Sequence, residues 1–186
     1  MSAVYPTKHL TTLDEWRKIG EANIYPPNSR IELINGEILD MAPIGFGHAG
    51  HVTRLMNLFA PYITNKALMT AQNPLQLGDL SEPEPDFMLM KLDNASYTTR
   101  HPNPDDVLLL IEVADRSLRF DQTEKLRLYA LHNIPEYWIL NLNNSSLEVY
   151  RKPNGETYAE KTTLGSGDHI SLSQLPGLSI HVADIL

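Results

Sequence analysis

The fold of this chain is decided by residues 107–113, which read VLLLIEV. Both alternating sets of positions in this stretch are apolar except for Glu112, a pattern typical of a strand that is covered on both faces. We therefore expect a strand in the middle of a sheet, with a carboxylate near its end. A lone ionised carboxylate is costly to bury unless a cation, a proton or several hydrogen bonds compensate.

A second acid borders a second apolar run, because residues 85–90 read PDFMLM. Asp86 precedes Glu112 by 112 − 86 = 26 positions. Two such acids, brought together by adjacent strands, carry the oxygen ligands that a hard divalent ion prefers. The sequence therefore predicts that Asp86 and Glu112 hold Mg²⁺, for which Mn²⁺ is a substitute.

Periodicity and turn signals predict the remaining elements outward from these two runs. Asn35-Gly36 supplies the positive φ angles of a type I′ turn and so predicts a hairpin. The expected strands are residues 30–34, 37–40, 67–77 with an interruption near Pro74, 86–91, 107–113, 137–142, 147–151 and 159–163. The expected helices are residues 12–20, 48–65 and 121–133, and the first begins with Thr12 and Glu15 at the spacing of a capping box. Residues 175–186 should form a closing turn with a short helix or strand. This order of elements predicts an α/β (α+β) fold with a mostly antiparallel sheet.

Length and composition indicate an ordinary globular protein. A chain of 186 residues fits one domain over residues 1–186, and 42% of the residues are hydrophobic. No stretch resembles a membrane span or a signal peptide, so we expect no membrane partner. Cysteine is absent from the sequence, which excludes disulfides, thiolate zinc sites and cysteine nucleophiles. The expected location is the cytoplasm.

The net charge of −8 argues against broad electrostatic attraction to nucleic acid. A bound metal and a local basic patch can nevertheless set the field at a cleft. Basic residues gather in one part of the sequence and are interleaved with acids: Arg116, Arg119, Lys125 and Arg127, with Asp115, Asp121 and Glu124. The alternative is that these residues form a solvated surface of mixed charge.

Lys125 and Glu32 are candidates to complete a hydrolytic site. Hydrolysis of a phosphodiester requires a metal, an activated water and a cation that orients or stabilises the reacting groups. Lys125 lies four residues after Asp121, the expected helix cap, so its ammonium and the positive end of the helix dipole could point the same way. Glu32 could add an oxygen ligand or hold a metal-bound water. The alternatives are an exposed helix lysine and a solvent-facing strand glutamate.

The histidines give a weaker signal. His48 and His51 have the spacing of one helical turn, but a metal pair without a third ligand is poorly supported. We expect His48 to form a hydrogen bond near the cleft or to contact phosphate, and His51 to be structural. Tyr129 and Trp138 are expected in the core, with their polar atoms paired locally. Glu84 lies between two prolines and is expected in a loop.

Four segments, taken in order, resemble the Uma-two family of restriction-endonuclease-like proteins, which belongs to the PD-(D/E)XK nuclease superfamily. The resemblance spans residues 12 to 186. The segments are RIELINGEI at residues 30–38, MAP at 41–43 followed by His48, EPD at 84–86, and IEVADRS at 111–117 with Asp121, Lys125, YA at 129–130 and IPEYWI at 134–139.

The resemblance implies a restriction-endonuclease-like core, a central mixed sheet flanked by helices, and Mg²⁺-dependent cleavage of DNA. It assigns Asp86 and Glu112 to the two acids of the superfamily motif. The superfamily lysine is expected two residues after the second acid, where this chain has Ala114. Lys125 is the matching position in the family pattern, and Glu32 corresponds to the extra acid that some members supply.

Three functional hypotheses follow. The first is a Mg²⁺-dependent endonuclease that cuts DNA, with Asp86 and Glu112 as metal ligands, Glu32 assisting, and Lys125 positioning the water or the scissile phosphate. By analogy with double-strand cutters, it should be a homodimer. The second is a catalytically degenerate protein of the nuclease fold that acts as a binding or oligomeric interaction module. The third is a metal-dependent hydrolase of a small phosphorylated or acyl substrate.

Overall fold

Strand β5 (Val107–Ala114) runs through the middle of a mixed sheet, and all eight of its residues are buried. The computed structural model describes residues 5–26 and 28–186. Its main sheet has the strand order β3-β4-β5-β6-β7-β8. The other strands are β3 (Leu68–Thr70), β4 (Phe87–Met90), β6 (Glu136–Asn141), β7 (Ser146–Asn154) and β8 (Thr157–Leu164). Strand β5 is parallel to β6, and the other neighbouring strands are antiparallel, which confirms the predicted fold class.

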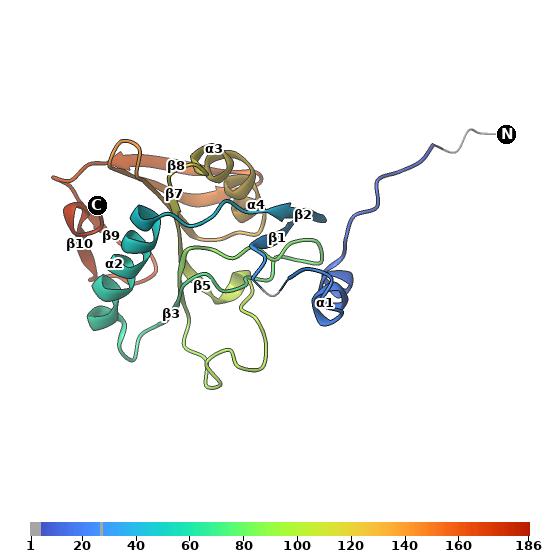
Figure 1. Cartoon of the computed structure of the whole chain (residues 1–186). Coiled ribbons are helices and arrows are strands. Elements are labelled where there is room, and N and C mark those ends of the chain that lie inside the picture. The colour runs from blue at the N-terminus through green and yellow to red at the C-terminus, as the bar shows by residue number, and fades with distance from the viewer. Residues whose placement is uncertain (1–4, 27) are drawn as a thin grey trace.

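The two faces of β5 pack into different layers, because successive side chains of a strand point to opposite faces. Leu109 and Ile111 belong to an apolar cluster that contains Phe59 of helix α2 (Phe46–Ile63). Leu110 belongs to a second cluster, which contains Tyr129 of helix α4 (Leu126–Leu131). Figure 1 shows α2 on one side of the sheet and the segment around α3 and α4 on the other. Glu112 lies two residues after Leu110, so its side chain points to the same face of the sheet, into the second layer.

The helical segment of the second layer has three parts. A short helix α3 (Leu118–Phe120) continues into a π-helical turn η2 (Asp121–Lys125) and then into α4. The expectation that the helix begins at Asp121 as a cap is wrong, because Asp121 itself has helical backbone angles of φ −66° and ψ −36°. Its side chain is buried and accepts a hydrogen bond from the Ser117 hydroxyl. An aspartate that is buried within the helical segment therefore has the same sequence pattern as an aspartate that caps a helix.

The N-terminal elements follow their local signals closely. Helix α1 (Leu13–Glu21) begins after Thr12, which forms the predicted capping box with Glu15. Strands β1 (Ile31–Ile34) and β2 (Glu37–Asp40) form the predicted hairpin. Its turn residues Asn35 and Gly36 have φ angles of +51° and +78°, as a type I′ turn requires. A bridge between Leu33 and Glu82 holds this hairpin against the rest of the molecule.

Two differences from the expected elements remain. The strand expected over residues 67–77 ends at Thr70, because the chain leaves the sheet before Pro74 and Gln72 takes a positive φ of +53°. A short pair of strands, β9 (His169–Ser171) and β10 (Ser179–His181), closes the apolar layer under α2, and only the second lies in the expected closing segment. Single 3-10 turns occur at η1 (Pro104–Asp106) and η3 (Val182–Asp184).

Candidate active site

Asp86 directly precedes β4, and Glu112 lies near the C-terminal end of β5. The two residues are side by side. The antiparallel register pairs Phe87 with Ile111, so the next positions, Asp86 and Glu112, face each other. The Asp86 amide donates a hydrogen bond to Glu112 Oε2 at 3.3 Å, and the Val113 amide donates to Asp86 Oδ2 at 2.9 Å. Two acids that are 26 positions apart in the sequence are therefore adjacent because of strand register.

Lys125 reaches the same place from the helical layer. Its Nζ lies 3.0 Å from Glu112 Oε1 and 3.3 Å from Glu32 Oε2. Lys125 is 3% exposed and Glu32 is 4% exposed, so the alternatives of an exposed helix lysine and a solvent-facing glutamate are both wrong. The helical segment begins at Leu118, so Lys125 lies 125 − 118 = 7 residues from its start rather than four. The expected help from a helix N-terminus is consequently weaker, since that effect fades after the first turn.

His48 contacts the opposite side of Asp86. Its Nε2 lies 2.9 Å from Asp86 Oδ2, and because an ionised carboxylate only accepts hydrogen bonds, Nε2 is the donor. His48 belongs to α2, so the helix on the other face of the sheet reaches this aspartate. His51 instead contacts the backbone oxygens of Gly47 and Leu186, which fits the expected structural role.

Tyr129 is a site residue that the sequence reasoning placed in the core. Its ring is fully buried, as expected, but its hydroxyl donates a hydrogen bond of 2.7 Å to Glu112 Oε1. Asp121, expected as a helix cap, also belongs to the pocket, and Gln72 Nε2 lies 3.5 Å from Asp86 Oδ1. The spacing of Lys125 and Tyr129, one helical turn apart, is the signal that could have placed the tyrosine beside the lysine.

The site holds four buried carboxyl groups around one buried ammonium. Glu32, Asp86, Glu112 and Asp121 are each less than 8% exposed. Burial raises the pKa of the Glu112 carboxyl well above its ordinary value, and the nearby Lys125 ammonium opposes this shift only in part. Burial likewise raises the pKa of Asp121 to about 6. The excess of negative over positive charge is what a bound cation would relieve.

Two groups in the site keep their charge despite burial. Burial alone would raise the pKa of Asp86, but hydrogen bonds from His48 and Val113 outweigh it and lower the pKa. Burial alone would lower the pKa of Lys125, but the Glu112 and Glu32 carboxylates outweigh it and raise the pKa. Asp86 is therefore a carboxylate and Lys125 an ammonium at neutral pH.

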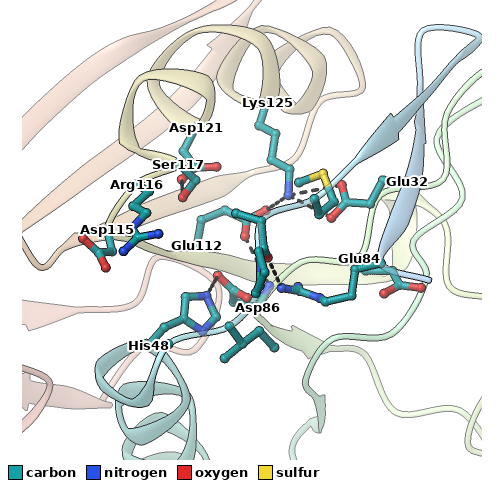
Figure 2. Close-up of a pocket in the computed structure, with 16 residues that line it drawn as sticks. Glu32, His48, Glu84, Asp86, Glu112, Asp115, Arg116, Ser117, Asp121 and Lys125 are labelled. Carbon is teal, nitrogen blue, oxygen red and sulfur yellow. Dashed lines mark hydrogen bonds and ion pairs between the residues drawn. The ribbon is translucent and has the colours of Figure 1, made fainter. Parts of the chain in front are cut away.

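Asp86, Glu112 and Lys125 line one pocket, which has a volume of about 300 Å³. Figure 2 shows Lys125 entering it from the helices, Glu32 and Glu84 on one side, and Asp115 and Arg116 on the other. Glu84 is an exposed loop residue, as expected, and it nevertheless borders the pocket. Of the arginines noted in the sequence, Arg116 lines the pocket as Lys125 does, whereas Arg127 forms an exposed ion pair with Glu156.

Carboxylate oxygens, the ligands that Mg²⁺ prefers, line the pocket. Within residues 5–26 and 28–186, no three His, Cys, Asp or Glu side chains are grouped as a ready metal site. Mg²⁺ is commonly held by one or two carboxylates, with waters and substrate oxygens as its other ligands. Within the described residues, Asp86 Oδ1 has only the 3.5 Å contact with Gln72, and Glu32 Oε2 faces the Lys125 ammonium at 3.3 Å. The residues present therefore fit Mg²⁺.

A family model described as "Uma2: Putative restriction endonuclease" matches residues 19–183. No curated protein matches the chain. The solved structure of a protein from Anabaena variabilis, described as a putative nuclease belonging to DUF820, aligns with a TM-score of 0.72 at 14% sequence identity and covers 94% of this chain and 96% of its own. At that identity, the likeness shows the fold alone.

In the part of the chain that the structure describes, none of the helices is both long enough and apolar enough to cross a bilayer.

Proposed function

The chain belongs to the Uma2 family, and on this premise we propose that it is a Mg²⁺-dependent endonuclease that hydrolyses phosphodiester bonds of DNA. The observation that carries the proposal is the convergence of Asp86, Glu112 and Lys125 in one pocket that opens to solvent. Two acidic side chains beside an ammonium group suit a reaction in which negative charge develops on a phosphate.

Each side chain has a distinct role in this proposal. Asp86 and Glu112 would hold Mg²⁺, which when bound offsets phosphate charge and makes water a better nucleophile near neutral pH. Lys125, held by Glu112 and Glu32, presents its ammonium to the scissile phosphate or the attacking water. His48 fixes the orientation of Asp86 through its Nε2 proton. Glu32 keeps Lys125 charged and in place, so it assists without needing to touch the substrate.

The position of the lysine supports this assignment. Ala114, which stands two residues after Glu112, has a methyl side chain packed in the layer of Tyr129, so it offers no cation. Lys125 reaches Glu112 from the neighbouring helix instead, at 3.0 Å. An ammonium approaching from a helix supplies the same charge as one from the strand, since the requirement is its distance from the reacting groups.

The proposal is tested by cleavage of plasmid DNA with Mg²⁺ and with Mn²⁺. We expect the wild type to cut and the variants Asp86→Asn and Glu112→Gln to lose about a hundredfold or more of the rate. Glu156→Gln is the matched control, because Glu156 is an exposed acid outside the pocket. Circular dichroism must show all variants folded. Equal cutting by wild type and both pocket variants would overturn the assignment, and folded wild type without cutting would favour a binding module.

A further inference from the structure

Two arginines line the pocket without pairing with its acids. Arg30 directly precedes β1, and Arg116 lies two residues after the end of β5; both side chains are exposed. Acidic side chains line the same pocket, yet within the part of the chain that the structure describes neither arginine forms an ion pair. Four other arginines of the chain do so: Arg17, Arg100, Arg127 and Arg151. The pocket therefore holds two guanidinium groups whose charge is not taken up by a carboxylate.

Arg30 is oriented by neutral groups. Its carbonyl accepts a hydrogen bond from the Met41 amide, which continues the β1–β2 ladder, and its guanidinium donates to the Ala42 carbonyl. A carbonyl fixes the side chain without cancelling its charge. Partial burial raises the pKa of the Glu84 carboxyl above its ordinary value, and the charge of Arg30 opposes this shift. Arg30 therefore lies close to Glu84, and its positive charge acts inside the pocket.

The two arginines lie on opposite sides of the acids that form the proposed metal site. Figure 2 shows Glu84 on one side of Asp86 and Arg116 on the other. Arg30 belongs to the side of Glu84. It lies two residues before Glu32, whose side chain is on that side too, and alternate residues of an extended strand point to the same face. A cation consequently stands on each side of Asp86.

Cations on both sides of the acids match a chain of phosphates. In a nucleic-acid strand every nucleotide carries a charged phosphate, so a phosphate at the acids has a neighbour on each side. A small phosphate ester has no such neighbours and would leave at least one of the two arginines without a ligand. Guanidinium groups match phosphate oxygens in charge and in geometry. The arrangement therefore favours a polynucleotide over a small substrate.

We propose that Arg30 and Arg116 bind the two phosphates that flank the phosphate held at Asp86 and Glu112, so that the ligand of the pocket is a polynucleotide strand. This inference rests on the proposed function for the choice of a phosphate as the ligand. Its binding component, however, does not require cleavage, so the two can be tested separately.

The test measures binding of a labelled DNA duplex by fluorescence anisotropy, in EDTA and at salt concentrations between about 50 and 200 mM. Each phosphate contact contributes about −0.9 to the slope of log K against log salt concentration. We expect Arg30→Gln and Arg116→Gln each to weaken binding about tenfold at the lowest salt and to make the slope shallower by about 0.9. Because the two arginines bind different phosphates, the double variant should make it shallower by about 1.8.

Arg127→Gln is the matched control, because Arg127 is an exposed arginine that pairs with Glu156 outside the pocket. We expect this variant to keep the affinity and the slope of the wild type. Arg116→Lys should also keep the slope, because the slope reports the number of phosphates neutralised and lysine retains the charge. Circular dichroism must show all variants folded.

The inference is overturned if the wild type does not bind the duplex at the lowest salt, if either single variant keeps the slope of the wild type, or if Arg127→Gln loses as much as they do. A double variant whose slope changes by only about 0.9 would mean that both arginines bind one phosphate, which also overturns it. Binding with the expected slopes but without Mg²⁺-dependent cutting would overturn the proposed function and leave the inference standing. Cutting by a wild type whose DNA binding does not depend on the two arginines would do the reverse.

Discussion

Glu112 is the residue on which the other polar groups of the pocket converge. Lys125 and Tyr129 both donate hydrogen bonds to its Oε1, and the Asp86 amide donates to its Oε2. These bonds fix the carboxylate in one orientation although burial raises its pKa. If Glu112 holds a cation, as proposed, its carboxylate does not have to be ordered on binding, which favours affinity.

Tyr129→Phe should lower the affinity of the protein for Mn²⁺ about tenfold, because it removes one bond that orients Glu112. The ring remains buried, so the cost in unfolding free energy should be about 1 to 2 kcal/mol. Tyr158→Phe is the control, since the Tyr158 hydroxyl also donates a buried bond, to the Ile134 carbonyl. Calorimetric titration and urea unfolding measure the two effects. An equal loss of Mn²⁺ affinity in both variants would contradict the role of Tyr129.

In the metal-free protein, ionisation of the Asp121 carboxyl makes the free energy of unfolding depend on pH. Its pKa of about 6 when folded lies above the ordinary value of 3.8, so the folded state holds more protons than the unfolded state between those values. This contribution to stability is therefore lost as pH rises through that range. Asp121→Asn avoids the loss and should be more stable than the wild type by about 2 kcal/mol at pH 7, with little difference at pH 4. Urea unfolding in EDTA at both pH values measures this, and a difference that does not change with pH would contradict it.

At the scale of elements, the signals that were purely local predicted the structure well. The Asn35-Gly36 turn, the Thr12 capping box and the apolar run of β5 need only neighbouring residues to be interpreted. The start of the helical segment was predicted incorrectly, because the pattern of Asp121 and Glu124 matches a cap whether or not the aspartate is buried. No local sequence pattern indicates the π-helical turn over Asp121–Lys125. This turn lies where the buried side chains of Asp121 and Lys125 enter the pocket.

The hairpin that carries Glu32 depends on Gly36. Gly36 has φ +78°, and a Cβ added there would lie 2.6 Å from Leu10 Cβ. Gly36→Ala should therefore destabilise the protein by about 1 to 2 kcal/mol more than Gly155→Ala. Gly155 is a fair control because it also has a positive φ, +61°, in a hairpin turn but has nothing within 4 Å of an added Cβ. Thermal unfolding of both variants tests this, and equal losses would show that the contact with Leu10 is unimportant.

The geometry of the site was only partly predictable at the scale of single residues. The sequence identified Asp86, Glu112, Glu32, Lys125 and His48, and the structure brings all five into one pocket. Strand register explains the first pair. The sequence did not identify Tyr129, because a tyrosine in an apolar helix is usually core, and only the tertiary fold turns its hydroxyl toward Glu112.

At the scale of the whole molecule, the distribution of charge matters more than its sum. The net charge of −8 argues against broad attraction to nucleic acid, and much of the excess acid in the pocket is buried around Lys125. Arg30 and Arg116 instead stand exposed at its mouth. A cation bound between the acids would reverse part of this charge imbalance at the point where a phosphate enters.

The central claim, that Asp86 and Glu112 hold a divalent cation, is tested most directly by calorimetric titration with Mn²⁺ at pH 7.5. We expect saturable binding heat in the wild type and in Glu156→Gln, and its loss in Asp86→Asn and in Glu112→Gln, with all four proteins folded. Absence of binding heat in the wild type, or the same heat in the two pocket variants, would contradict the claim.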